Sequence, residues 1–183
     1  MVGRRPGGRR AVFFDRDGVL NQAKVLEGRP YPPDDAESAV LTEQAPELLA
    51  ALKDKGFFLF AVTNQPDAAR GKTTVEKIQA INQKIQDSLP LDGLRTCFHD
   101  RQDQCRCRKP QPGLILDLAR DYDIDLAGSF IVGDRASDVE AGRRAGVKTV
   151  FLDFAYNEPG PDQPPDFTCR SLAEAVRRIL EGE

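Results

Sequence analysis

Two carboxylates at the end of a short apolar run constrain this chain more than any other feature of its sequence. Residues 11–14 are apolar and predict a buried β-strand, which runs directly into Asp15-Arg16-Asp17-Gly18. Ligands of open α/β sheets bind beyond the carboxyl ends of the strands, so we expect Asp15 and Asp17 to converge on one crevice. Paired carboxylates repel each other, and a hard cation such as Mg2+ relieves the repulsion. An acidic turn that merely ends a strand is the alternative.

Two further apolar runs also end in polar residues. The run at 57–62 is followed by Thr63, and the run at 129–132 is followed by the acidic segment 133–138. Between them, Lys109 precedes a helical pattern. A strand-end hydroxyl, further carboxylates and a lysine are groups that metal-assisted phosphoryl chemistry requires. These segments therefore predict a single site assembled at the ends of three strands.

Taken in order, these motifs resemble those of the haloacid dehalogenase superfamily of phosphohydrolases. The resemblance covers residues 12–138 and comprises DxDG, the strand-end threonine, the lysine and GDxxxD. Each motif alone is weak, but all four in the family's order are specific. The resemblance implies a phosphatase that acts through an aspartyl-phosphate and depends on Mg2+.

The resemblance also implies roles for the matched residues. Asp15 would attack phosphorus, and Asp17 would protonate the leaving oxygen and then activate water. Mg2+ would be held by Asp15, the backbone carbonyl of Asp17 and Asp134. Asp138 would lie behind these ligands and orient Lys109 or a metal-bound water.

Other residues are expected to contact the phosphate and the remainder of the substrate. Thr63 and Lys109 would hold the phosphoryl oxygens through a hydrogen bond and a positive charge. Arg108 has the planar fork suited to a second phosphate or to hydroxyl groups. The full set of expected substrate contacts is Asn64, Gln65, Arg108 and Arg135.

A second constellation lies within residues 97–107, which hold three of the four cysteines and the only histidine. Three thiolates and one imidazole suit a closed tetrahedral structural Zn2+ site. Such a site would hold Arg108 and Lys109, which follow Cys107 in the chain, in place. Disulfides are one alternative, although they would be reduced in the cytosol, and unpaired buried thiols are another. Cys169 lies far away and is expected to be a packing residue. The predicted zinc ligands are Cys97, His99, Cys105 and Cys107.

The pattern Cys-x-His, spacer, Cys-x-Cys-Arg-Lys-Pro is similar to two groups of capless phosphatases in the superfamily. One removes the 7-phosphate of D-glycero-D-manno-heptose 1,7-bisphosphate, and the other is the histidinol-phosphate phosphatase domain. Segments 63–71 and 109–114 resemble the heptose group more, although Pro66-Asp67 stands where that group carries Ser-Gly. Heptose bisphosphate is therefore the predicted substrate and histidinol phosphate the alternative. A non-catalytic binding module whose loop is held by zinc is a further alternative. Such a module would not need Asp17 and Lys109, so their presence argues against it.

Apolar strands alternate with helical patterns, which predicts an α/β fold: a three-layer, Rossmann-like parallel sheet with helices on both faces. The expected strands are residues 11–14, 57–62, 94–98, 129–132 and 148–152. The expected helices are residues 43–55, 73–88, 113–120, 137–145 and 171–180. Neither gap between the motifs has room for a cap domain, so we expect a capless, open site. Residues 23–39 and 153–166 show no regular pattern, and long irregular segments are often functional.

Length and charge fit one domain. At 183 residues the chain can bury one good core, and we expect a flexible, arginine-rich arm at 1–10 followed by a single domain at 11–183. The net charge of −3 gives no general attraction to nucleic acid. No apolar run approaches a membrane span and no signal region is visible, which predicts a cytoplasmic protein. The expected partner is a small phosphorylated sugar or a related phosphomonoester, and a monomer is favoured.

Overall fold

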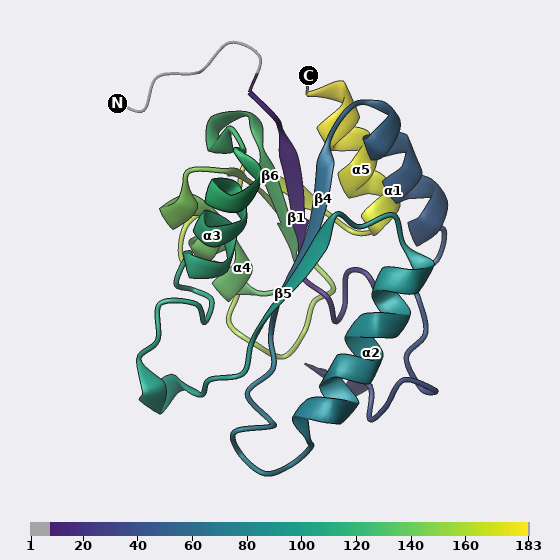
Figure 1. The fold of residues 1–183 in the computed structure, drawn as a ribbon, viewed down its shortest axis with the longest axis vertical. Helices are drawn as coiled ribbons and strands as arrows, with labels where there is room; N and C mark the ends of the chain where they lie inside the picture. The colour runs from purple at the N-terminus through teal and green to yellow at the C-terminus, as the bar shows by residue number, and fades with distance from the viewer. Residues whose placement is uncertain (1–7, 183) are drawn as a thin grey trace.

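A parallel six-stranded sheet forms the centre of the molecule (Figure 1). The computed structural model describes residues 8–182 of the 183-residue chain. The strands are β1 (Ala11–Phe14), β4 (Phe58–Asn64), β5 (Gly93–Cys97), β6 (Phe130–Gly133), β7 (Lys148–Leu152) and β8 (Phe167–Cys169). Their order across the sheet is β5-β4-β1-β6-β7-β8, and every pairing is parallel.

Five α-helices cover the two faces of this sheet (Figure 1). On one face lie α1 (Ala45–Asp54), α2 (Val75–Ser88) and α5 (Leu172–Glu181), and on the other lie α3 (Gly113–Tyr122) and α4 (Ala136–Ala145). Two 3-10 helices, Arg101–Asp103 and Leu126–Gly128, lie in connections. The predicted three-layer α/β fold is therefore confirmed.

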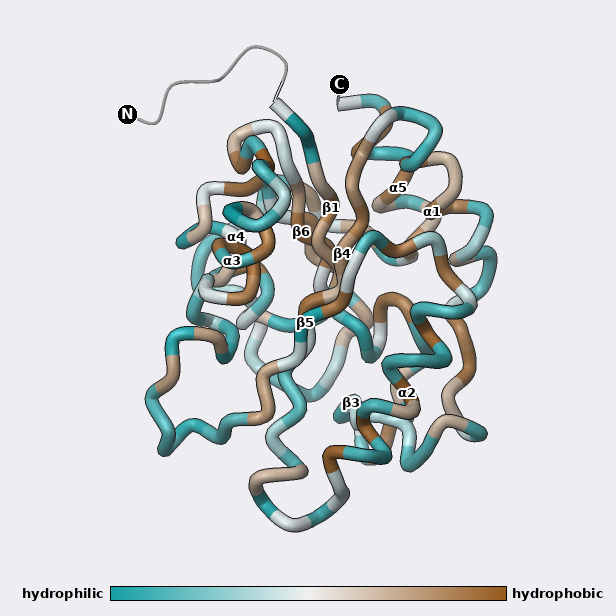
Figure 2. Tube along the Cα trace, viewed as in Figure 1, coloured by the Kyte–Doolittle hydropathy of each residue, from teal (hydrophilic) through white to brown (hydrophobic). Residues whose placement is uncertain are grey.

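The strand β1 shows why the sheet forms where it does. All four of its residues are fully buried, because alternate side chains enter two different cores. Val12 and Phe14 pack towards α1, α2 and α5, whereas Ala11 and Phe13 pack towards α3 and α4. Figure 2 shows the central strands as a hydrophobic layer inside more hydrophilic surroundings.

The order of the strands places a topological switch point beside β1. The chain runs from β1 to its neighbour β4 and on to β5, and then returns to β6 on the other side of β1. The carboxyl ends of β1, β4 and β6 consequently open onto one edge of the sheet, where α/β proteins bind ligands.

Two side-chain caps and a glycine mark three of the helix boundaries. Thr74 caps α2 by accepting a hydrogen bond from the backbone nitrogen of Lys77, and Ser171 caps α5 in the same way. Gly146 ends α4 with a φ of 82°, a conformation that glycine adopts without strain. Val75, in the first turn of α2, is 38% exposed, whereas Ile78, Ile81 and Ile85 are buried.

The structure corrects the prediction of an irregular segment at 23–39. Residues Lys24–Leu26 (β2) and Arg29–Tyr31 (β3) form an antiparallel hairpin, turned by Glu27 and Gly28 with φ values of 51° and 75°. Most of its side chains face solvent, so the alternation that marks a half-buried strand is missing. The short edge strand β8 was also missed, because it follows a long proline-rich stretch.

The segments between the motifs hold only short elements. In the described chain, the hairpin and α1 separate β1 from β4, and α2, β5 and a 3-10 helix separate β4 from α3. Neither segment forms a second domain, as the capless prediction requires. Most of the predicted arm lies outside the described residues, but Arg9 and Arg10 accept backbone hydrogen bonds from Asp125 and Phe58. No helix among the described residues is long and apolar enough to span a bilayer.

Candidate active site

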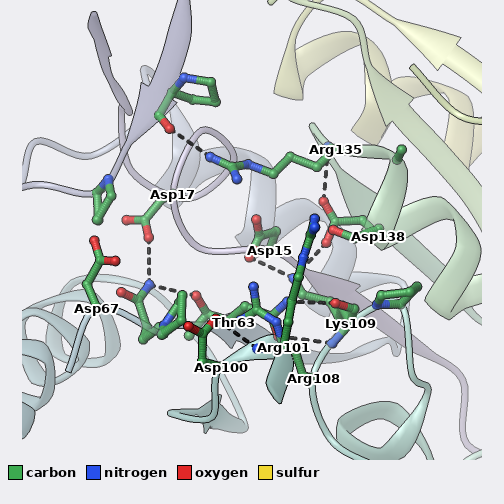
Figure 3. A pocket seen from close by; sticks show the side chains of 18 of the residues that line it. Asp15, Asp17, Thr63, Asp67, Asp100, Arg101, Arg108, Lys109, Arg135 and Asp138 are labelled. Atoms are coloured by element: carbon green, nitrogen blue, oxygen red, sulfur yellow. Dashed lines mark hydrogen bonds and ion pairs between the residues drawn. The ribbon is translucent and has the colours of Figure 1, made fainter. Parts of the chain in front are cut away.

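A crevice of about 1110 Å3 opens at the carboxyl edge of the sheet (Figure 3). Its walls come from the loops after β1, β4 and β6, from the β2–β3 hairpin, from the segment 100–111 and from residues 157–159. Asp134 is only 3% exposed and lines a smaller adjoining cavity. The predicted site residues that line the crevice are Asp15, Asp17, Thr63, Asn64, Gln65, Arg108, Lys109, Arg135 and Asp138.

Asp15 lies directly after β1 and is only 8% exposed. Its backbone nitrogen donates to the carbonyl of Val132 at 2.9 Å, which ties the loop to β6. Burial raises the pKa of Asp15 to about 6; Lys109 opposes this rise, whereas the charges of Asp138 and Asp17 add to it. Asp15 is thus a buried carboxylate whose negative charge depends on nearby cations.

The ammonium of Lys109 lies between two carboxylates (Figure 3). Its Nζ donates to Asp15 Oδ1 at 2.8 Å and to the Val62 carbonyl at 2.7 Å, and it lies 2.6 Å from Asp138 Oδ1. An ammonium has three donors; two make these hydrogen bonds, and the ammonium also forms an ion pair with Asp138. Burial opposes the charge on Lys109, but Asp138 and Asp15 outweigh burial and raise its pKa. Lys109 therefore remains charged and fixes the position of Asp15.

Asp134 provides the clearest sign of a cation site. Neither of its buried carboxylate oxygens has a hydrogen-bond partner of good geometry among the described residues. Burial raises the pKa of Asp134, and the charges of Asp15 and Asp138 raise it further. Oxygens of these three carboxylates lie within 4.8 Å of one another, and Lys109 offsets only one of three negative charges. A divalent cation with a preference for oxygen ligands fits this arrangement.

Two glycines make room for these carboxylates. A Cβ at Gly18, whose φ is 87°, would overlap Asp134 Oδ2, and a Cβ at Gly133 would overlap the Asp138 side chain. Tyr156 closes the same side, and burial together with the negative charge of Asp134 raises its pKa. Its hydroxyl consequently stays protonated beside the acidic group.

Asp17 has a different environment from Asp15. Its carboxylate accepts hydrogen bonds from the side chains of Arg16, Asn21 and Gln65. Gln65 Nε2 also donates to Thr63 Oγ1 at 2.9 Å. Asp17 and the strand-end hydroxyl are therefore joined through one amide on the wall of the crevice.

The strand β4 extends to Asn64, two residues beyond its predicted end, and this extension has a consequence for Lys109. Asn64 Nδ2 donates to the Lys109 carbonyl at 2.9 Å, and the Lys109 nitrogen donates to Asn64 Oδ1 at 3.0 Å. Both polar atoms of the amide thus hold the backbone that carries the lysine. In this arrangement Asn64 positions the backbone of Lys109 at the wall of the crevice.

The two arginines expected at the substrate have unequal freedom. Arg135 donates to the Pro30 carbonyl at 2.7 Å and lies 3.9 Å from Glu158, so it connects the hairpin to the loop after β7. Arg108 donates to the His99 carbonyl at 3.2 Å and forms no ion pair with the described residues. Its guanidinium extends into the crevice (Figure 3).

Several charged residues of the crevice were not identified from the sequence. In the sequence, a single charged residue in a loop cannot be distinguished from a solvent-exposed surface residue. Arg70 donates two hydrogen bonds to Asp100, at 2.9 and 2.6 Å, and a third to Asp67 at 3.2 Å. These bonds connect the loop after β4 to the segment that contains the cysteines. The unexpected charged residues are Arg29, Asp67, Arg70, Lys72, Asp100, Arg101 and Glu158.

The predicted cysteine and histidine ligands lie together and form the Cys/His cluster, which consists of Cys97, His99, Cys105 and Cys107. All three thiols are free, and distances between neighbouring ligand atoms are 3.2–3.7 Å. A tetrahedral Zn2+ with bonds of about 2.3 Å to sulfur spaces its ligands by roughly 3.8 Å, which is close to these distances. Burial opposes ionisation of Cys105, but hydrogen bonds from Arg108 and Cys107 lower its pKa to about 7. The cluster is therefore able to hold a metal ion.

Known proteins resemble this chain in sequence and in fold. Residues 106–175 match the family described as "HAD-hyrolase-like". A D-glycero-beta-D-manno-heptose-1,7-bisphosphate 7-phosphatase from Helicobacter pylori is 38% identical over 149 residues, covering 78% of this chain and 83% of the relative. The enzyme of the same name from Escherichia coli is 35% identical over 188 residues, covering 94% of this chain and 95% of the relative.

A solved structure adds the three-dimensional likeness. It is the D,D-heptose 1,7-bisphosphate phosphatase from B. bronchiseptica complexed with magnesium and phosphate. It superposes with a TM-score of 0.75 at 26% identity, covering 95% of this chain and 99% of that one. Sequence and structure agree, and the chain belongs to the haloacid dehalogenase-like phosphatases, in the family that these heptose-bisphosphate phosphatases represent.

Proposed function

We propose that this phosphatase removes the 7-phosphate of D-glycero-D-manno-heptose 1,7-bisphosphate in a Mg2+-dependent reaction. One observation carries the substrate assignment. Arg108, which lies next to Lys109 in the chain, lines the same crevice as Asp15 and forms no ion pair among the described residues, although the charge of Asp100 acts on it. A substrate with a phosphate at each end fits a catalytic pocket that has a second cationic position nearby. The names of the relatives support the same substrate.

Asp15 and Asp17 would carry the two chemical steps. A carboxylate oxygen of Asp15 attacks phosphorus as the bond between phosphorus and the 7-oxygen breaks, and Asp17 gives its proton to the leaving oxygen. Asp17 then takes a proton from water as that water attacks the aspartyl-phosphate. Inorganic phosphate leaves and the carboxylate of Asp15 is restored.

The unpartnered oxygens of Asp134 support a Mg2+ site shared by Asp134, Asp15 and the backbone carbonyl of Asp17. When bound, Mg2+ would offset the repulsion between the phosphate and the carboxylates. Asp138 would act through Lys109, with which it already forms an ion pair.

Lys109 and Thr63 would stabilise the transferring phosphoryl group. Because Lys109 already makes two hydrogen bonds and an ion pair within the protein, the lysine acts first by its charge and by orienting Asp15. A phosphate oxygen can replace one of these acceptors as it enters. Thr63 is 1% exposed at the base of the crevice and offers a hydroxyl donor.

We further propose that the Cys/His cluster binds a structural Zn2+ that holds Arg108 in place. The Arg108 backbone nitrogen donates to Cys105 Sγ at 3.3 Å, and its guanidinium donates to the carbonyl of His99. Ordering the ligands would therefore order this arginine directly. We propose that the protein acts in the cytoplasm, because the thiols of such a site must stay reduced and the cytoplasm keeps them so.

A substrate panel tests the proposed function. We expect kcat/KM for heptose 1,7-bisphosphate to exceed that for histidinol phosphate by at least about tenfold, or about 1.4 kcal/mol. The reason is that histidinol phosphate carries a cationic amine, which Arg108 and the neighbouring Arg101 would repel. Equal or faster turnover of histidinol phosphate would contradict the assignment. Absence of turnover with all phosphomonoesters would favour a binding module instead.

A further inference from the structure

Arg16 is a fully buried arginine to which the proposed mechanism gives no role. It stands between Asp15 and Asp17 in the chain and is 0% exposed. A buried guanidinium is costly unless it is paired and hydrogen-bonded. Arg16 meets this requirement through Asp17: its Nε donates to Oδ1 at 3.1 Å and its Nη2 donates to Oδ2 at 3.0 Å. The two parallel bonds fix both the position and the plane of the carboxylate.

The remaining end of the guanidinium is anchored in α2. Arg16 Nη1 donates to Asn82 Oδ1 at 2.7 Å, and Asn82 Nδ2 donates to Thr96 Oγ1 on β5 at 3.0 Å. Asn82 is only 7% exposed and lies beside Ile78, Ile81 and Ile85, which are the buried residues of the helix. A buried amide costs stability unless its polar atoms are bonded, and here both are bonded. The helix therefore holds Arg16 from a rigid part of the core.

Asp17 consequently receives four hydrogen bonds. Arg16 supplies two, Asn21 Nδ2 donates to Oδ1 at 3.1 Å, and Gln65 Nε2 donates to Oδ2 at 2.7 Å. Asp17 and Gln65 line the crevice, whereas Arg16, Asn21 and Asn82 do not. The Arg16 guanidinium thus binds the Asp17 carboxylate on the side away from the crevice, and Gln65 is the donor on the side of the crevice.

We propose that Arg16, anchored by Asn82, is a positioning residue that fixes the Asp17 carboxylate for proton transfer to the leaving oxygen. The inference rests on the proposed function, in which Asp17 is the general acid. A proton donor must come within hydrogen-bond reach of the oxygen it protonates, so a loosely held carboxylate loses much of its effect. A lysine at this position would keep the charge but would lose the two-point contact.

The test compares substrates with different leaving groups. An alkyl phosphate needs protonation of its leaving oxygen, whereas p-nitrophenyl phosphate needs little help because its leaving group is a weak base. We expect Arg16→Met to lower kcat/KM by about tenfold more for the best alkyl phosphate of the substrate panel than for p-nitrophenyl phosphate. Asn82→Ala should change the ratio in the same direction by roughly threefold, and Arg16→Lys should lie between Arg16→Met and the wild type.

The ratio of the two kcat/KM values does not depend on how much of a preparation is folded, because both substrates meet the same active protein. Thr149→Val is the matched control, since Thr149 is also buried and hydrogen-bonded but lies at Asp166, away from the crevice. It should leave the ratio unchanged.

The outcomes distinguish a failure of the role of Arg16 from a failure of the role of Asp17. If Asp17→Asn changes the ratio and both Arg16→Met and Asn82→Ala leave it unchanged, the role of Arg16 is overturned while the role of Asp17 stands. Full rescue by Arg16→Lys would also overturn the two-point contact. An unchanged ratio in Asp17→Asn would overturn the proposed function of Asp17 and the inference with it.

Discussion

Lys109 Nζ lies 2.8 Å from Asp15 Oδ1 and 2.6 Å from Asp138 Oδ1, so one ammonium serves two buried carboxylates. We expect Lys109→Met to lower kcat by about a hundred- to a thousandfold, because it removes the charge that orients Asp15 and faces the phosphate. Steady-state kinetics at saturating Mg2+ measures this loss. Lys55→Met, at an exposed position, should leave kcat unchanged.

Removing the lysine should also destabilise the fold at neutral pH, by about 3 kcal/mol, because it leaves buried carboxylates without their cation. Adding Asp138→Asn should restore part of this loss, since it removes one of the carboxylates. Urea denaturation of the two single variants and the double variant measures the coupling. Additive effects would contradict a direct interaction between these residues.

Asp15→Asn should abolish nearly all Mg2+-dependent turnover, because an amide cannot act as the nucleophile. Asp17→Asn should slow turnover but still allow phosphate to be transferred to Asp15. Acid quenching with a labelled substrate would then detect phosphoprotein in Asp17→Asn and none in Asp15→Asn. Wild-type turnover by Asp15→Asn would show that another residue attacks phosphorus.

Asp134 makes stability depend on pH and Mg2+. Burial raises the pKa values of Asp134 and Asp15 above the ordinary 3.8, to about 6 for Asp15. The folded state therefore holds protons that the unfolded state releases first. The associated stability is present below pH 3.8 and is lost as the pH rises through the folded-state values. Without metal, the free energy of unfolding should thus be lower at about pH 7.5 than at about pH 5, by about 1.4 kcal/mol for Asp15 alone.

Saturating Mg2+ should reverse this loss, by about 2.7 kcal/mol at a hundred times its Kd. Asp134→Asn should stabilise the metal-free protein at about pH 7.5 and abolish the response to Mg2+. Denaturation curves with Mg2+ or with EDTA test both effects. An unchanged response to Mg2+ in Asp134→Asn would place the cation elsewhere.

The sequence was sufficient to place the central strands and the helices, because their signals are local. Apolar runs followed by polar residues marked β1, β4 and β6, and the predicted ends of the helices and of β4 lie within two residues of the observed ones. The β2–β3 hairpin lacked such a signal, because its side chains are mainly exposed and distant residues hold it. The Gly28 carbonyl accepts from the Asn157 nitrogen at 2.7 Å, which joins the two segments predicted to be irregular.

In the candidate site, too, the sequence predicted some features and not others. Residue types and their order in the chain indicated which side chains gather at the crevice. Their pairing could not be read from the sequence, because Asn64 contacts Lys109 and Arg16 contacts Asn82 only once distant elements pack together. In the sequence, Arg16 is simply the residue between Asp15 and Asp17, and nothing there indicates that the fold buries it completely.

The Cys/His cluster should bind about one Zn2+ per chain, separate from the catalytic Mg2+. Cys105→Ala should lower zinc content, thermal stability and activity together, because Cys105 also accepts the hydrogen bond from the Arg108 nitrogen. Elemental analysis of protein purified without chelators measures the first effect. Cys169→Ala is the control: this cysteine is more deeply buried than Cys105 but lies in the other core, so zinc content should not change. Zinc far below one equivalent in the wild type would contradict the site.

Arg108 should determine selectivity for a second phosphate. Partial burial lowers its pKa and the charges of Arg70 and Arg101 act in the same direction, so an added anion would stabilise the guanidinium. We expect Arg108→Ala to lower kcat/KM for heptose 1,7-bisphosphate by at least about tenfold and to change it less than about threefold for a small monophosphate. The backbone bond to Cys105 remains possible in this variant, so the loop should keep its shape.

Arg106→Ala provides the control for the loss of positive charge from the same loop. Arg106 is bonded to Asp117 on the surface and does not line the crevice. It should therefore leave both kcat/KM values near those of the wild type. If the two variants lowered turnover of the bisphosphate equally, the effect would come from the general field of the loop, and a specific contact between Arg108 and the second phosphate would be ruled out.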